Sequence, residues 1–156
     1  MKKLIGMLLL LSILPLILVG CRDRQVDLNT VLDEINTRYP DSMTDMRRLT
    51  DVSELKNYYY IHPEDVKQFA AEVRSNTVDA PVEIVIAEAV DSEAAQNIYD
   101  ALERRYNSTV SQYASYSPEQ LDVVQNCGVN RDGRFVILAV CDHYDGVMDV
   151  FNEYIQ

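Results

Sequence analysis

One cysteine near the amino end stands in a pattern that supports a specific covalent chemistry. Cys21 directly follows the segment Leu18–Gly20, and an apolar run over residues 4–19 begins after two lysines. A basic start, an apolar core and small residues at the end are the three parts of an export signal. A thiol placed there can become a thioether to a diacylglyceryl group. The segment is therefore predicted to be a lipobox, with signal-peptidase cleavage between Gly20 and Cys21.

Cleavage at that bond would place the folded part outside the cytoplasm. Two or more acyl chains anchor a protein stably, whereas one binds only marginally. An uncleaved transmembrane helix is the alternative, but the apolar run is near the lower length limit for a span, and Pro15 weakens a long helix there. We expect residues 1–20 to be a signal peptide, 21–26 the lipidated cysteine and a short tether, and 27–156 one domain at the extracytoplasmic face of the cell membrane.

The charge balance narrows the classes of partner. The formal net charge is −11 at pH 7, and removal of Lys2 and Lys3 with the signal makes it −13. Such a surface repels nucleic acid and anionic lipid headgroups. The composition argues against nucleic-acid binding and is compatible with basic partners, with divalent cations or simply with solubility. It does not specify an oligomeric state.

Two further cysteines, Cys127 and Cys141, remain for the folded part. An exported chain can form disulfides. However, Asp132-Gly133 predicts a two-residue hairpin that sets residue 127 opposite 138 and residue 141 opposite 124. The two side chains would then point to opposite faces, which favours two buried thiols over a disulfide and leaves the pairing open. With no Cys-x-x-Cys pair and only two histidines, nothing resembles a zinc site.

The densest group of ligand-type side chains is the segment Asp142–Asp145. Asp142, His143 and Asp145 could bind a divalent metal. The favoured interpretation is that Asp142 caps the last helix and Asp145 lies near its positive end. We therefore predict no metal site.

Catalytic patterns are not evident in the sequence. Asn130–Gly133 lacks the spaced acidic ligands of a calcium loop and is predicted to be a turn. No serine stands in a Gly-x-Ser-x-Gly context. Glu83 and Glu88 lie at odd separation on a predicted strand, so they point to opposite faces and cannot pair as acid and base. We expect no catalytic residues, no cofactor and no enzymatic activity.

Three consecutive tyrosines, Tyr58, Tyr59 and Tyr60, form a candidate partner contact. They cannot all face one core, so at least one should be exposed or cover an edge. Tyrosine offers a large contact area with one polar tip. The alternative is partial burial with the hydroxyl groups in water.

Apolar periodicity predicts an α+β fold with an antiparallel sheet of about four strands in two hairpins. The sheet is packed with a long central helix, an amino-terminal helix and a carboxy-terminal helix. Residues 41–50 are predicted to be a loop, and 66–74 fits either a helix or a strand, with strand favoured. The predicted helices cover 27–39, 53–59, 92–113 and 142–155; the predicted strands are 66–74, 82–90 and a hairpin over 128–141.

Several segments, taken in order, resemble a known family. Tyr60–Asp65 (YIHPED) runs into the first predicted hairpin, Tyr116–Glu119 (YSPE) follows the long helix, and Gly133 marks a later turn before an apolar strand. With the lipobox at Cys21, the whole mature chain resembles domain-of-unknown-function family 4358, small lipoproteins mainly of Gram-positive, clostridia-like bacteria. The resemblance implies a strand at 66–74. It implies no activity and no catalytic residues.

Two functions are compatible with these features. The first is a non-enzymatic lipoprotein that binds another envelope or secreted protein, with the tyrosines or an uncovered sheet face as the contact. The alternative is a small-ligand or divalent-cation-binding accessory module of the cell envelope that uses the acidic groups near Asp142 and His143. A flat apolar patch with tyrosines would favour the first, and a concave polar pocket the second.

Overall fold

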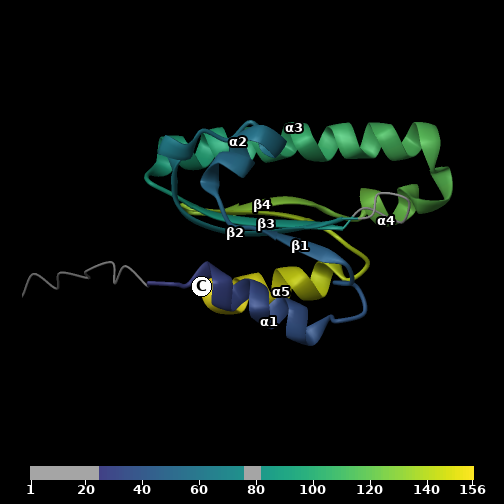
Figure 1. Cartoon of the computed structure of the whole chain (residues 1–156), viewed down its shortest axis with the longest axis horizontal. Helices are drawn as coiled ribbons and strands as arrows, with labels where there is room; N and C mark the ends of the chain where they lie inside the picture. The colour runs from purple at the N-terminus through teal and green to yellow at the C-terminus, as the bar shows by residue number, and fades with distance from the viewer. Residues whose placement is uncertain (1–24, 76–81) are drawn as a thin grey trace, which may run out of the picture.

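A five-stranded antiparallel sheet forms the middle of the molecule (Figure 1). The computed structural model describes residues 25–75 and 82–156. Its strands are β1 (Met46–Leu49), β2 (Val66–Arg74), β3 (Glu83–Ala89), β4 (Gly128–Asp132) and β5 (Phe135–Val140), in the spatial order β1-β2-β3-β5-β4. The strand prediction for 66–74 is thereby confirmed.

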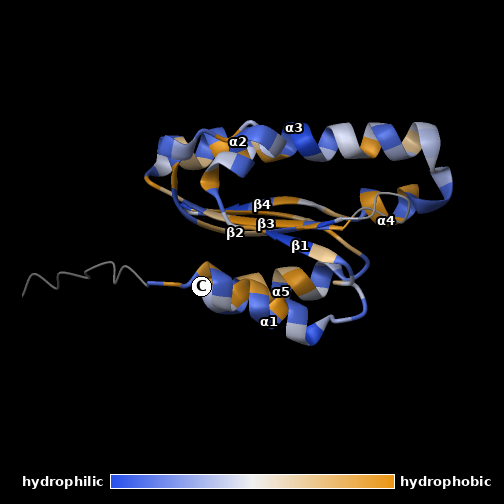
Figure 2. Cartoon of the chain, in the orientation of Figure 1, coloured by the Kyte–Doolittle hydropathy of each residue, from blue (hydrophilic) through white to orange (hydrophobic). Residues whose placement is uncertain are grey.

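Helices cover both faces of this sheet. On one face lie α1 (Leu28–Arg38) and α5 (Tyr144–Ile155), and on the other lie α2 (Val52–Tyr59), α3 (Ser92–Tyr116) and α4 (Leu121–Gln125), with short 3-10 turns at Pro63–Asp65 and Pro118–Gln120 (Figure 1). Apolar residues concentrate on the strands and on the helix sides toward them (Figure 2). The α+β class, the antiparallel sheet and the long central helix are confirmed.

The two central strands explain why the sheet needs two helical layers. Every residue of β3 is buried, and from Val136 onward so is every residue of β5. On β3, Val85 and Ala87 pack under α2 and α3, while Ile84 and Ile86 pack against α1 and α5. A strand that is apolar on both faces must be covered on both faces.

Aspartate side chains cap the first turns of three helices, α1, α2 and α3. Asp27 accepts a hydrogen bond from the Asn29 N–H at the start of α1, and Asp91 accepts one from the Ala94 N–H at the start of α3. At α2, Asp51 and Glu54 form a reciprocal capping box. These bonds satisfy amide groups that otherwise have no partner in the first helical turn.

The fifth strand, β1, was predicted to be a loop, and that prediction is wrong. Its sequence is Met-Arg-Arg-Leu, and only Leu49 is buried. The strand forms because it pairs with β2, where Leu49 lies opposite Ala71. Arg48 is held by Glu72 at 2.9 Å and by Asp33 at 2.6 Å. A short edge strand needs little apolar sequence when charged groups tie it down.

Two details near the carboxy end also differ from prediction. The hairpin turn is Gly133-Arg134, with Asp132 opposite Phe135, because the positive φ of +57° falls at the first turn position, where Gly133 stands. The register therefore shifts by two residues, which leaves each side chain on its predicted face. The last helix begins at Tyr144, and its N-cap His143 makes no capping bond. Asp142 belongs to the preceding turn, so the predicted cap is wrong.

The signal sequence, the lipobox with Gly20 and Cys21, and the turn at 79–81 lie outside the described residues. Within the described ranges, no helix combines the length and the apolar character that a membrane crossing requires.

Candidate functional site

The end of α2 distributes the three consecutive tyrosines between core and surface. Tyr59 is buried at 2% exposure, whereas Tyr58 is 51% exposed and Tyr60 78%. Tyr60 ends the helix in the left-handed conformation (φ 60°), and its N–H donates to the Lys56 carbonyl. A non-glycine residue in this region carries backbone strain. The prediction that at least one of the three tyrosines is exposed is confirmed.

A groove of about 490 Å³ separates the end of α2 from the middle of α3. We call it the tyrosine–arginine groove; its lining residues are Asn57, Tyr58, Tyr59, Tyr60, Ala101, Arg104, Arg105 and Ser108. In Figure 1 the two helices lie side by side on the same face of the sheet. The groove therefore combines the three tyrosines that were predicted to form a contact with two arginines that were not part of that prediction.

A buried carboxylate fixes the floor of this groove. Glu83, at the start of β3, is 3% exposed. It accepts hydrogen bonds from Arg105 Nε at 3.1 and 3.2 Å, from the Tyr59 hydroxyl at 3.3 Å and from Thr109 Oγ1 at 3.5 Å. Burial, and then the neighbouring Glu83 charge, raise the pKa of Tyr59, so its hydroxyl stays protonated and donates. A buried charge with this many donors is stabilised in place.

The two arginines of the groove differ in how many of their guanidinium N–H groups form hydrogen bonds. Within the described part of the chain, Arg105 donates only through Nε, and Arg104 is exposed with no hydrogen bond or ion pair. At the rim, the Arg47 guanidinium lies 5.5 Å from the centre of the Tyr58 ring and binds Glu54 at 2.7 Å. The groove therefore presents free guanidinium donors next to a positioned aromatic ring.

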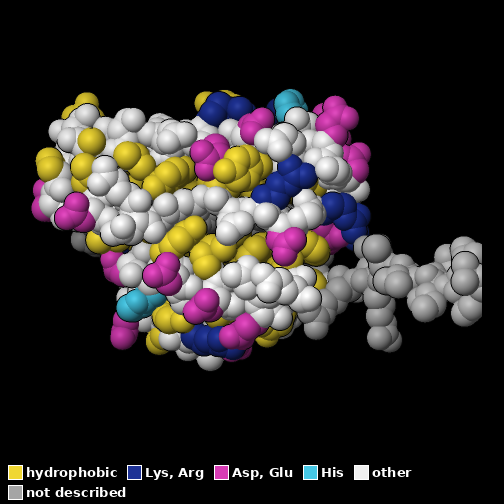
Figure 3. Space-filling model, turned by 180° about the vertical axis from the view of Figure 1, so that it is seen from behind, with side chains coloured by type: hydrophobic (Ala, Val, Ile, Leu, Met, Phe, Trp, Pro, Cys, Tyr) yellow, Lys and Arg dark blue, Asp and Glu magenta, His cyan; other side chains and the backbone are white. Residues whose placement is uncertain are grey.

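Exposed large hydrophobic side chains are few among the described residues: Tyr58, Tyr60, Val90 and Tyr116. Two of these four belong to the groove. The face turned away in Figure 1 shows apolar patches interrupted by charged and polar groups (Figure 3). The groove is thus the place where two large exposed aromatic side chains come together.

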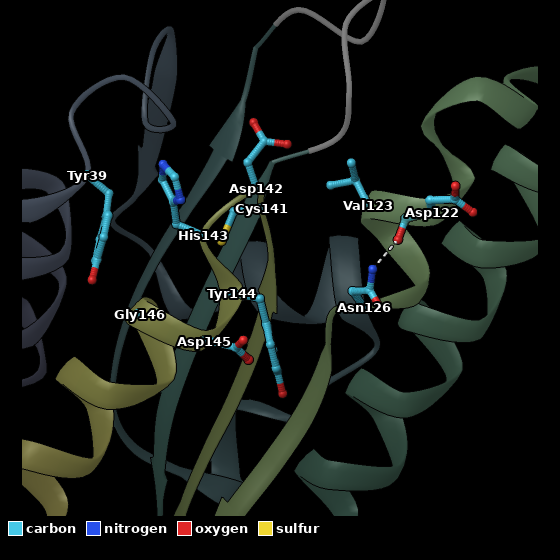
Figure 4. A pocket seen from close by; sticks show the side chains of 10 residues that line it. All are labelled: Tyr39, Asp122, Val123, Asn126, Cys141, Asp142, His143, Tyr144, Asp145 and Gly146. Carbon is cyan, nitrogen blue, oxygen red and sulfur yellow. Dashed lines mark hydrogen bonds between the residues drawn. The ribbon is translucent and has the colours of Figure 1, made fainter.

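A second cavity, of about 610 Å³, contains the segment Asp142–Asp145 (Figure 4). We call it the acidic cavity; its lining residues are Tyr39, Asp122, Val123, Asn126, Cys141, Asp142, His143, Tyr144, Asp145 and Gly146. Tyr39 and His143 stand together on one side, with ring centres 5.3 Å apart, and Asp122 lies on α4 at the other side (Figure 4). A Cβ at Gly146 would overlap the Tyr39 ring, so glycine permits this close approach.

The acidic cavity suits a basic ligand better than a metal ion. Three aspartates surround it, and two tyrosines add aromatic faces. Among the residues that the structure describes, no group of three or more His, Cys, Asp and Glu side chains could hold a metal ion. Asp142, His143 and Asp145 are therefore near one another without forming a ligand set.

Cys127 and Cys141 are free and buried, which agrees with the favoured prediction. They belong to the two different core clusters, on opposite faces of the sheet. The Cys127 thiol lies 3.2 and 3.3 Å from the Val123 and Cys141 carbonyls, to either of which it can donate its one hydrogen, and accepts from the Cys141 N–H at 3.3 Å. This thiol joins the end of α4 to the end of β5.

Neither thiol is expected to react in the folded protein at neutral pH. Burial raises the pKa of Cys141 to about 12 from its ordinary value near 9, and burial also raises that of Cys127. Because the thiolate is the reactive form, iodoacetamide should label neither site until urea is added, as peptide mass mapping would measure. Rapid labelling of Cys141 in the native protein would contradict this prediction.

The raised pKa of Cys141 makes the stability of the folded protein depend on pH in the alkaline range. The folded state keeps the Cys141 proton that the unfolded chain loses near pH 9, so the Cys141 contribution is fully present below that pH. It decreases as the pH rises from about 9 towards 12. A Cys141→Ala chain, measured by urea unfolding, should lack this part of the alkaline decrease.

The chain matches one known protein family. The family described as Domain of unknown function (DUF4358) matches residues 27–141, and the chain belongs to it. No curated protein and no solved structure matches the chain. The matched residues include the whole tyrosine–arginine groove, whereas half of the acidic cavity's lining, residues 142–146, follows the matched segment.

Sequence reasoning identified Tyr58, Tyr59 and Tyr60 but missed the residues that build the groove with them, Arg104, Arg105 and Glu83. The only available signal was the adjacent arginine pair on the long helix of an acidic chain. Glu83 and Glu88 do point to opposite faces, as predicted: Glu83 meets Arg105, and Glu88 meets Lys67 at 2.7 Å.

Proposed function

We propose that this protein is a lipid-anchored, extracytoplasmic and non-enzymatic module that binds an envelope or secreted protein through the tyrosine–arginine groove. The observation that carries the proposal is the pair of exposed rings, Tyr58 and Tyr60, beside a groove whose floor is held by Glu83 and Arg105. Exposed tyrosines and arginines around a rigid hollow are the side chains that contribute most to protein interfaces.

The position of the groove in the fold supports this proposal. The described chain enters the domain at Val26, which packs in the core cluster of α1 and α5. The groove lies between α2 and α3, on the other side of the sheet (Figure 1). A lipid on Cys21 would therefore attach the domain by one side and leave the groove directed away from the membrane.

Site-specific photocrosslinking in intact cells tests the proposal. A benzophenone amino acid replaces Tyr60 in one chain and Tyr116 in a control chain, because these side chains are similarly exposed at 78% and 83%. We expect one reproducible protein adduct from position 60, identified by mass spectrometry, and none of the same mass from position 116. Equal adduct patterns at both positions, or no adduct at position 60, would overturn the proposal.

The acidic cavity supports a second candidate function, as a small-ligand-binding accessory module. Its volume of about 610 Å³ and its three aspartates would suit a small basic ligand. This alternative predicts a rise in melting temperature with basic cell-wall fragments and a loss of that rise in an Asp142→Asn chain. Unchanged melting curves across wall fragments, calcium and zinc would remove it.

A further inference from the structure

We infer that the partner segment which enters the tyrosine–arginine groove is acidic, with an Asp or Glu carboxylate held between Arg104 and Arg105. This inference rests on the proposed function and specifies the chemistry of its partner. The two arginines lie next to each other on α3, and both line the groove. Guanidinium groups bind carboxylates through directed, charge-assisted hydrogen bonds.

The charge of the groove is opposite to that of the chain as a whole. The chain has 25 acidic and 14 basic residues. None of the eight residues that line the groove is acidic, and two of them are arginines. In a chain of net charge −11, Glu83 balances Arg105 while the charge of Arg104 is uncompensated by any described residue, which makes the groove a local positive site that attracts anionic groups and repels basic ones.

The floor of the groove prepares Arg105 for an incoming anion. Its Nε is bonded to both oxygens of the Glu83 carboxylate, which is 4% exposed, while 43% of the Arg105 side chain faces solvent. Glu83 therefore holds the orientation of the guanidinium and balances its charge. Arg104 has no partner among the described residues, so its full charge remains for the ligand.

The flanks of the groove favour a peptide over a membrane or a phosphate polymer. Tyr58 and Tyr60 offer broad aromatic surfaces on which the residues beside the carboxylate can pack, and Asn57 and Ser108 offer short polar groups for its backbone. An anionic membrane would instead meet a broad area of a chain whose net charge is −11, which repels it.

Charge variants of the crosslinking chain test the inference. In the chain with benzophenone at position 60, Arg104→Glu is expected to lower the adduct yield about tenfold, since a like charge then faces the carboxylate. Arg104→Lys should keep more of the yield than Arg104→Glu but less than the parent, because it keeps the charge without the guanidinium geometry. Lys56→Glu is the matched control, because Lys56 is exposed on α2 but does not line the groove; it should leave the yield unchanged. The crosslinked partner peptide should contain Asp or Glu.

The possible results distinguish a failure of the proposed function from a failure of the inference that the partner is acidic. If position 60 gives no adduct in the unsubstituted chain, the proposed function fails and the inference fails with it. If the adduct forms but Arg104→Glu leaves its yield unchanged, or the crosslinked peptide has no acidic residue, only the inference is overturned. An adduct with a phosphate polymer in place of a protein would overturn both.

Discussion

A Cys21→Ser chain is expected to lose its lipid label and its cleavage by the lipoprotein signal peptidase. The reason is chemical: the thiolate forms the thioether, and the much less acidic serine hydroxyl cannot replace it at neutral pH. Cleavage before residue 21 follows lipidation, so the serine chain should keep the apolar run of residues 4–19. Metabolic labelling with a fatty acid and the mass of the protein would measure both effects.

A Cys141→Ala chain provides the control for this experiment. Its lost thiol is buried at 2% exposure, so it should keep the lipid label and the membrane location of the parent. The mass of the retained protein separates the alternatives further. A parent chain retained at full length would show that the apolar run itself is the anchor. A Cys21→Ser chain that is cleaved and retained as before would contradict the lipobox.

The sequence predicts best those strands that are buried on both faces, because their residues are then apolar in a continuous run. On β5, Val136, Leu138 and Val140 face one helical layer and Ile137 and Ala139 face the other. Such continuous apolar runs can form only in the middle of a covered sheet. The sequence could not predict β1 in the same way, because Met46–Leu49 has one buried residue, and the carboxylates that hold Arg48 are distant in the chain.

The candidate site was predictable only where the signal was local. Consecutive tyrosines at 58–60 must diverge whatever the tertiary structure is, and they do. The meeting of Glu83 with Arg105 depends on how α3 is rotated over β3, across 22 residues of sequence. The acidic cavity likewise joins Tyr39, Asp122 and Asp145 from three separate helical segments. Periodicity identifies the buried side of a helix but not which strand residue it meets.

The largest effect on stability at the groove is expected from Arg105→Met. This change removes a guanidinium from Glu83 while the carboxylate stays buried at 3% exposure. Removal of one partner from a fully buried ion pair costs about 3 kcal/mol or more of unfolding free energy; because 43% of the Arg105 side chain faces solvent, the loss here should be about 1–2 kcal/mol. Urea denaturation at pH 7 would measure the loss. Arg104→Met is the matched control, since Arg104 is exposed and unpaired in the described part of the chain, and it should cost about 0.5 kcal/mol or less.

A double-mutant cycle shows whether this loss comes from the charge of Glu83. Glu83→Gln keeps the shape of the side chain and removes its charge, so combining it with Arg105→Met should recover about 1 kcal/mol or more of the single-variant loss. Equal stability of Arg105→Met and Arg104→Met would mean that Tyr59 and Thr109 alone hold the carboxylate. In that case Arg105 would be free to move, and the groove would not present a fixed donor to an acidic partner. A large, cycle-dependent loss therefore supports the rigid floor on which the proposed recognition depends.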